Sequence, residues 1–202
     1  MRYLLIILCS FYTLVSCSQS TSETDLAQDN QVSSEKNVPD PERKLVEIIR
    51  ENHIPKSDLS IKIDKSAYAL SVYNKDTVLI TYPCVFGFNA IDDKAQEGDG
   101  CTPEGKFGVR SKYAHKSWNY FIWIDYPNKE SWSRFNRRKA NGEIGKDGTI
   151  GGEVGIHGVP EGGDYLIDER VNWTLGCISL KNDHVEDLYK CLSDKVQIEI
   201  VH

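Results

Sequence analysis

The sequence predicts a mostly β domain, either a sandwich or a barrel, with a helix packed on it. Apolar and polar residues alternate in several short segments, which is typical of strands with one buried face. Turn residues such as Asn, Asp, Gly and Pro separate these segments. Strong helical periodicity appears only in one late segment inside the domain. Many short strands with one late helix are typical of a β sandwich or barrel.

Seven segments are predicted to be strands or to lead into one: 59–63, 67–73, 77–85, 103–110, 121–125, 150–157 and 195–201. Segments 59–63, 67–73 and 195–201 alternate apolar and polar residues, and 103–110 is expected to be a turn into a strand. The stretch 87–102 between the third and fourth segments is polar and contains glycine, so we expect a loop there.

Residues 182–192 are predicted to form the late helix, with Asn182 or Asp183 as its N-cap and Val185 and Leu188 on its apolar face. A shorter helix is expected ahead of the first strand, within a lead-in of residues 41–58. We expect it to begin at Pro41, with Asp40 as its N-cap.

The N-terminus predicts export. Residues 1–16 carry one basic residue and a short apolar run, which suits a signal peptide and is too short to span a membrane. The run ends in Leu14-Val15-Ser16-Cys17, which resembles a bacterial lipobox. That resemblance implies a lipid on Cys17 and an anchor in a bacterial membrane, facing the periplasm or cell envelope. Soluble secretion after cleavage nearby is the alternative. Residues 17–40 are predicted to be the lipidated cysteine and a flexible tether.

Composition limits the partners. The 202 residues carry a net charge of -6, which argues against nucleic acid because its recognition needs a basic face. Hydrophobic residues make up 40%, enough for one packed domain over residues 59–202. Nothing in the sequence indicates an oligomeric state.

Four cysteines belong to the predicted domain. Cys84 and Cys101 flank one loop, and either a disulfide between them or two buried free thiols is consistent with the sequence. Cys191 lies on the apolar side of the late helix and is expected in the core. The histidines at 53, 115 and 184 stand in polar settings and are expected at the surface.

Two segments contain residues suited to catalysis: Gly155–Pro160, with His157, and Trp173–Leu180, with Cys177. A thiol needs a base, or a neighbour that lowers its pKa, to attack a carbonyl near neutral pH, and histidine is the usual partner. Gly176 would let backbone N–H groups approach a developing oxyanion. Taken alone, the pair is equally consistent with a core histidine and a buried thiol.

The sequences of these two segments resemble motifs of the YkuD-type L,D-transpeptidase catalytic domain. His157-Gly158, followed later by Thr174-Leu-Gly-Cys177, is similar to the family's central motif. Gly98-Asp-Gly-Cys-Thr-Pro-Glu-Gly-Lys-Phe107, Asp125-Tyr-Pro-Asn128 and Leu180-Lys-Asn-Asp183 resemble other landmarks in the family's order. The resemblance covers about residues 59–202.

The resemblance implies a β-rich, sandwich-like catalytic domain and a reaction on peptidoglycan stem peptides. Cys177 would be the nucleophile, His157 the general base, and the Gly158 carbonyl would orient the imidazole. Backbone N–H groups of Leu175, Gly176 and Cys177 would form the oxyanion hole. A thioester resolved by an amine gives a 3→3 cross-link, and one resolved by water gives L,D-carboxypeptidase activity. Attachment or release of a wall-linked amine uses the same chemistry. We expect no cofactor and no metal.

The sequence departs from the family pattern at two positions. Many members carry His where this chain has Leu175, and Arg where it has Ser179. We therefore keep Thr174, Ser179 and Lys181 as candidate substrate contacts, with Lys181 a candidate replacement for the missing guanidinium.

Two other interpretations remain open. A catalytically inactive wall-binding lipoprotein would keep the fold without the chemistry. A metal site of His157, Cys177, His184 and Cys191 is disfavoured, because the spacing fits no compact zinc motif. The aromatic and basic region from Trp118 to Arg138 is expected either to pack as core and strand or to form a lid over the substrate.

Overall fold

The structure is a computed structural model that describes residues 43–202. The predicted signal peptide, Cys17, the tether and the Asp40 cap lie outside the described residues. Within residues 43–202, no helix combines the length and the apolar character that crossing a membrane requires.

The first sheet has five strands in the order β3-β2-β1-β9-β4. Their bounds are β1 Leu59–Asp64, β2 Ala69–Asn74, β3 Thr77–Pro83, β4 Gly105–Phe107 and β9 Gln197–Val201. Strands β1 to β3 form an antiparallel meander, while β9 pairs with β1 in parallel. The sequence alternation explains the burial, since every second residue of β1 from Leu59 is buried.

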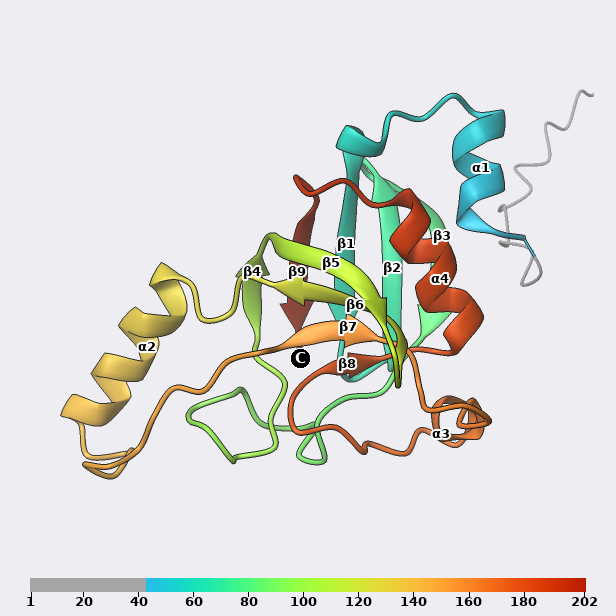
Figure 1. Cartoon of the computed structure of the whole chain (residues 1–202). Coiled ribbons are helices and arrows are strands. Elements are labelled where there is room, and N and C mark those ends of the chain that lie inside the picture. Colours follow the sequence, from blue (N-terminus) through green and yellow to red (C-terminus); the bar gives the residue numbers. More distant parts are fainter. Residues whose placement is uncertain (1–42) are drawn as a thin grey trace, which may run out of the picture. The chain divides into compact units, whose positions relative to one another are not determined.

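The second sheet has four strands in the order β5-β6-β7-β8, with bounds Val109–His115, Asn119–Ile124, Gly155–His157 and Ile178–Ser179. Its strands run across those of the first sheet (Figure 1). The domain is therefore mostly β with two sheets, as predicted, and of the two predicted forms it is not a closed barrel.

Helix α4 (Asn182–Cys191) is the predicted late helix, and it packs on β6 and β7. Val185 and Leu188 are fully buried, as the apolar periodicity predicts. The predicted cap is wrong, because the N-cap position is Lys181 and no side chain caps the helix there.

Helix α1 (Leu45–Glu51) begins later than predicted because its cap comes from elsewhere in the chain. The buried carboxylate of Asp187 in α4 accepts hydrogen bonds from the backbone N–H groups of Leu45 (2.6 Å) and Val46 (3.1 Å). It also accepts one from the hydroxyl of Tyr82 at 2.7 Å. A carboxylate at a helix N-terminus satisfies unpaired N–H groups, so Asp187 sets the start of α1. The short 3-10 turn Lys56–Asp58 follows.

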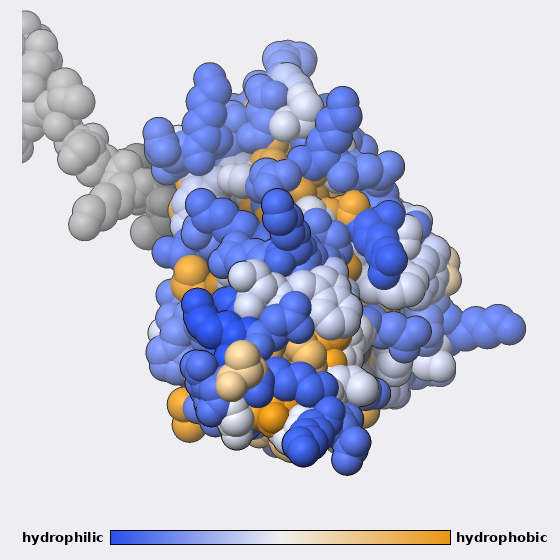
Figure 2. All heavy atoms as spheres, turned by 90° about the vertical axis from the view of Figure 1, so that its left-hand side faces the viewer, coloured by the Kyte–Doolittle hydropathy of each residue, from blue (hydrophilic) through white to orange (hydrophobic). Residues whose placement is uncertain are grey.

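Helix α2 (Lys129–Ala140) was not predicted. Its N-cap is Asn128, whose side-chain oxygen accepts from the N–H groups of Glu130 and Ser131, both at 3.0 Å. It buries only Ser131 and Phe135, so the apolar periodicity that marks most helices is weak here. Figure 2 shows that the side of the molecule carrying α2 is largely hydrophilic. A fourth helix, α3 (Tyr165–Asp168), is a single turn.

Cys84 and Cys101 are both buried free thiols, so the second of the two predicted alternatives holds. Cys191 is buried in the core, as predicted.

Candidate active site

Two short parallel strands bring the two predicted segments side by side. In the pairing of β7 with β8, Ile156 lies opposite Ile178 and His157 opposite Ser179. Cys177 directly precedes β8, so this pairing brings the predicted nucleophile next to the strand that carries His157. Gly155 occupies the β7 position nearest Cys177 and cannot be larger, because an added Cβ would lie 2.5 Å from the ring of Phe121.

His157 is held on three sides. It is 2% exposed, and its Nδ1 lies 2.7 Å from the carbonyl oxygen of Gly158. Trp118 stacks on the imidazole with ring centroids 4.5 Å apart, and Phe121 lies nearly parallel to it at 5.8 Å. A carbonyl only accepts hydrogen bonds, so Nδ1 carries the proton and Nε2 is left as a free base.

The environment keeps His157 neutral. Burial lowers the pKa of His157 to about 4, and the hydrogen bond to Gly158 opposes this only in part. His115, which stacks on the far side of Trp118, lowers it slightly further.

No residue larger than glycine fits at position 158. A Cβ at this position would lie 2.2 Å from Oδ1 of Asn182 and 2.8 Å from the carbonyl oxygen of Trp118. The Gly158 N–H also donates to that Trp118 carbonyl at 3.0 Å. The predicted contact between the Gly158 carbonyl and the imidazole is thus present, in a backbone packed too closely for any side chain.

Cys177 has a looser environment. Its thiol donates to the carbonyl oxygen of Glu153, with sulfur and oxygen 3.5 Å apart, and no hydrogen bond within residues 43–202 joins it to His157. Glu153 has a positive φ of 56°, an uncommon conformation for a residue with a side chain. Burial raises the pKa of the Cys177 thiol to about 11, while the N–H of Gly155 and the charge of Lys94 act to lower it. Thiol and imidazole are therefore both neutral near pH 7.

Thr174 supports the turn that presents Cys177. Its hydroxyl donates to the Cys177 carbonyl oxygen at 2.7 Å and accepts from the Gly176 N–H at 3.2 Å. Gly176 has φ 142°, and a Cβ there would lie 2.7 Å from the Cys101 carbonyl oxygen. Thr174 is only 5% exposed, which corrects its prediction as a substrate contact.

The same turn leaves two of the three predicted oxyanion-hole donors available. The Gly176 N–H is already bonded to Thr174, so Leu175 and Cys177 remain as candidate donors. The Leu175 side chain is 78% exposed, beside the nucleophile turn.

The predictions that Ser179 and Lys181 contact substrate also need correction. Ser179 is completely buried, and its hydroxyl donates to the Gly158 carbonyl oxygen at 3.3 Å, behind the imidazole. Lys181 pairs with Asp168 of α3 at 2.6 Å, so its ammonium is engaged away from the nucleophile. Neither replaces the missing arginine in this structure.

The loop 87–102 lies directly against the nucleophile turn. Single β-bridges link Val85 to Ser179 and Gly87 to Thr174. A Cβ on Gly87 would lie 2.0 Å from the Gly100 carbonyl oxygen and 3.1 Å from the Gly176 Cα, so three backbone segments meet there. The sequence predicted only a polar loop.

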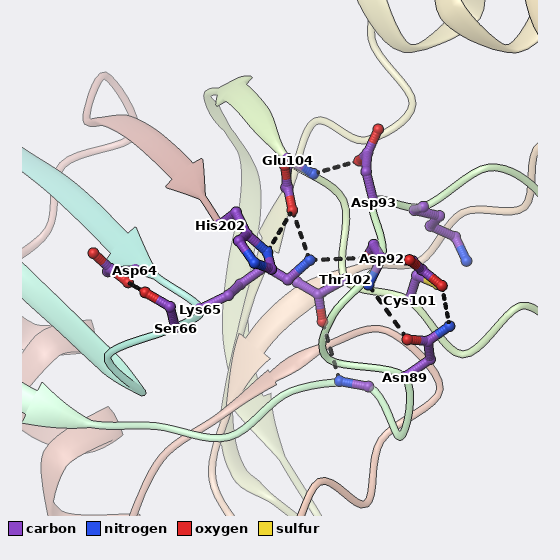
Figure 3. A network of polar contacts seen from close by, with 12 residues as sticks. Asp64, Lys65, Ser66, Asn89, Asp92, Asp93, Cys101, Thr102, Glu104 and His202 are labelled. Carbon is purple, nitrogen blue, oxygen red and sulfur yellow. Dashed lines mark hydrogen bonds and ion pairs between the residues drawn. The ribbon is translucent and has the colours of Figure 1, made fainter.

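Buried polar contacts hold this loop in place (Figure 3). The fully buried ammonium of Lys65 donates to the Asp92 carbonyl oxygen and to Glu104, both at 2.8 Å. The Thr102 hydroxyl accepts from the Gly87 N–H at 3.1 Å. Sequence reasoning missed these residues because polar side chains in a polar loop are expected in solvent.

Other predicted features fall in different places. His53 is exposed as predicted, whereas His115 and His184 are half-buried, with His115 stacked on Trp118 at 4.4 Å. Of the region expected to be core or lid, Trp118 packs on His157 and the arginines belong to α2. Over the described part of the chain, no three His, Cys, Asp or Glu side chains gather where a metal ion would be held.

Comparison with known proteins agrees with this architecture. Bd1075 of Bdellovibrio bacteriovorus has a similar fold at 19% identity and a TM-score of 0.51, over 71% of this chain and 48% of that one. The helical cell shape determining protein Pgp2 of Campylobacter jejuni matches at 23% identity and a TM-score of 0.50, over 70% and 46%.

An L,D-transpeptidase from Mycobacterium smegmatis matches at 16% identity and a TM-score of 0.47, over 72% and 59%. The chain thus spans about half the length of these solved structures. No curated protein sequence matches significantly. The model of the YkuD L,D-transpeptidase catalytic domain matches residues 58–200, so the chain belongs to this family.

Proposed function

We propose that this protein is a cysteine acyl-transfer enzyme that acts on peptidoglycan stem peptides and forms 3→3 cross-links. The observation that carries the proposal is the imidazole of His157. Its Nδ1 is bound to the Gly158 carbonyl oxygen at 2.7 Å, so its Nε2 is a free base, and its strand β7 pairs with β8, which directly follows Cys177.

The first half-reaction breaks an amide bond. The Cys177 sulfur attacks the carbonyl carbon of the third stem residue while Nε2 of His157 takes the thiol proton. Proton transfer must accompany the attack, because thiol and imidazole both start neutral. The tetrahedral intermediate collapses, the proton passes from Nε2 to the leaving nitrogen, and D-alanine departs. The product is a thioester on Cys177.

The second half-reaction resolves the thioester. The amine of a second stem attacks the thioester carbon and gives its proton to Nε2, which returns it to the departing sulfur. One amide bond is broken and one is formed, with no net change in protons or electrons. Water in place of the amine gives a tripeptide with a free carboxylate, the L,D-carboxypeptidase outcome.

The thiol must release its present hydrogen bond before its proton passes to His157. Its hydrogen bond now goes to the Glu153 carbonyl oxygen, and a rotation about the Cα–Cβ bond moves the sulfur on a partly exposed side chain.

A product assay with purified tetrapeptide muropeptides, read by mass spectrometry, tests the proposal. We expect a 3→3 dimer and released D-alanine with the native protein, and neither product with Cys177→Ala. Tripeptide without dimer would replace cross-linking by carboxypeptidase activity. Muropeptide binding without any product or carbapenem adduct on Cys177 would favour the inactive wall-binding lipoprotein.

We also propose that the protein is exported and carries lipid on Cys17. The support is the lipobox-like sequence ahead of that residue. Metabolic labelling with a fatty-acid analogue should mark the native protein and not Cys17→Ala. Equal labelling of both would contradict the anchor.

A further inference from the structure

A buried lysine lies beside the nucleophile turn. The Lys94 side chain is 4% exposed, and its Nζ donates to Asp99 Oδ1 at 2.9 Å and to the Gln96 carbonyl oxygen at 3.2 Å. An ammonium carries three N–H donors. The residues that the structure describes provide hydrogen-bond acceptors for two of them.

The ammonium of Lys94 lies close to the turn that presents Cys177. A Cβ built on Gly176 would lie 3.8 Å from Lys94 Nζ, so the charge lies against the residue that precedes Cys177. Two charged side chains act on the thiol: Lys94 lowers the pKa of Cys177, and Glu153 raises it. Lys94 is thus the one cation among the groups of the described chain that act on this sulfur.

The partner of Lys94 is itself ionised and held by backbone groups. Burial acts to raise the pKa of Asp99, but hydrogen bonds from Lys94 and from the N–H groups of Cys101, Gln96 and Ala95 hold it below its ordinary value. Asp99 therefore keeps its charge and orders the loop segment around Lys94. Because the aspartate also makes three backbone hydrogen bonds, it does not need the lysine to be satisfied.

The helix that sequence reasoning missed holds this loop from the outside. Arg138 of α2 donates to the Lys94 carbonyl oxygen at 2.8 Å and pairs with Asp93 at 2.9 Å. Arg134, one turn earlier, pairs with the same Asp93 carboxylate at 3.2 Å. The backbone of Lys94 is therefore clamped between α2 and the Asp99 turn, and its ammonium has a defined place.

We propose that Lys94 is a positioning residue for Cys177, whose ammonium beneath the Gly176 turn favours negative charge on the sulfur and on the carbonyl oxygen under attack. This inference rests on the proposed function for its role in turnover. Its electrostatic part does not, because the reactivity of the thiol is measurable without a stem peptide.

The test is the pH profile of Cys177 alkylation by iodoacetamide in the full chain, resolved by peptide mass spectrometry. In Lys94→Gln, which keeps a hydrogen-bonding side chain but loses the charge, we expect the pKa of Cys177 to rise by about one unit. Alkylation at pH 8 then slows about tenfold, because a tenfold change accompanies each pKa unit below the midpoint. Lys94→Arg should restore most of the rate.

Lys65→Met is the matched control. Lys65 is equally buried and holds the same loop, through the Asp92 carbonyl oxygen and Glu104 (Figure 3), but is not among the groups acting on Cys177. We expect it to lower the unfolding temperature and leave the thiol pKa unchanged.

The outcomes separate the two proposals. An unchanged thiol pKa in Lys94→Gln, or an equal rise in Lys65→Met, overturns the role of Lys94. A rise in Lys94→Gln alone supports it even if no stem-peptide product is found, in which case the proposed function fails by itself. If Lys94→Gln does not fold, urea titration of Lys94→Arg decides: a folded Arg variant must retain the native alkylation profile.

Discussion

His157 ends strand β7 and Cys177 directly precedes the neighbouring strand β8, yet their surroundings differ. The imidazole is buried, stacked on Trp118 and bonded to a backbone that tolerates no side chain at Gly158. The thiol is half-buried and makes one hydrogen bond, to the Glu153 carbonyl oxygen. The base is therefore part of the core packing, whereas the nucleophile depends on a turn. Substitutions at Cys177 should lower activity alone, whereas substitutions at His157 should lower both activity and the stability of the fold.

The largest contrast is expected between Cys177→Ala and His157→Gln. Both should lower turnover of muropeptides by about a thousandfold or more, because nucleophile and base act as a unit. Only His157→Gln should also destabilise the fold, by about 1–2 kcal/mol, since it removes a stacked, buried ring. Urea unfolding monitored by tryptophan fluorescence measures the difference. Equal stability of the two variants would contradict the architectural role of His157.

Gly158→Ala tests whether the tightly packed backbone beside His157 is needed for both stability and activity. The added methyl meets the Asn182 side chain and the Trp118 carbonyl oxygen, so we expect a loss of about 2–3 kcal/mol in unfolding free energy. Displacement of the imidazole should also reduce turnover at least about tenfold. Gly145→Ala is the control, because a Cβ at Gly145 meets nothing within 4 Å. A neutral Gly158→Ala would show that the backbone shifts freely there.

The neutral imidazole predicts a pH dependence. The pKa of His157 is lowered to about 4 in the folded state and is about 6.5 when unfolded. As the pH falls, the unfolded protein takes up a proton on His157 near pH 6.5, whereas the folded protein does so only near pH 4. For this group, the free energy of unfolding therefore has its full value above pH 6.5 and decreases as the pH falls toward 4. At pH 5 the loss is about 2 kcal/mol.

Urea midpoints at pH 7.5 and pH 5 measure this loss, and His157→Gln provides the baseline for other groups such as His184. The native protein should lose more stability on acidification than the variant. Parallel losses would show that His157 titrates normally and is not desolvated.

The smallest effect is expected at Ser179, behind the imidazole. Ser179→Ala removes one buried hydroxyl whose bond to the Gly158 carbonyl oxygen is 3.3 Å long, so the cost should be about 0.5–1.5 kcal/mol. The KM for muropeptides should not change. A large rise in KM without a change in kcat would restore Ser179 as a substrate contact.

Much of the framework was predictable from local patterns. The alternation in β1, β2 and β9 and the periodicity of α4 reflect burial on one face, which is visible in a single segment. The site segments were predicted from His157, Cys177 and the resemblance of their surroundings to a family motif. The structure adds that Gly155, Gly158 and Gly176 stand where close packing leaves no room for a side chain.

What escaped prediction depends on partners distant in sequence. Helix α1 begins at Leu45 because Asp187, 142 positions along the chain, supplies its cap. Helix α2 buries little and is held by arginine contacts to Asp93 and to the Lys94 backbone. Ser179 and Thr174 look like substrate contacts until their burial is known. No local pattern contains this information.

The Asp187 carboxylate also has a mechanical consequence. It joins the first turn of α1, the hydroxyl of Tyr82 in β3 and the middle of α4 in one buried node. A pull on the chain ahead of Leu45 would load this node first, as shear across several charge-assisted hydrogen bonds rather than as peeling of a strand. Such tension would be carried into α4 and β3 before it reached the strands that hold His157 and Cys177.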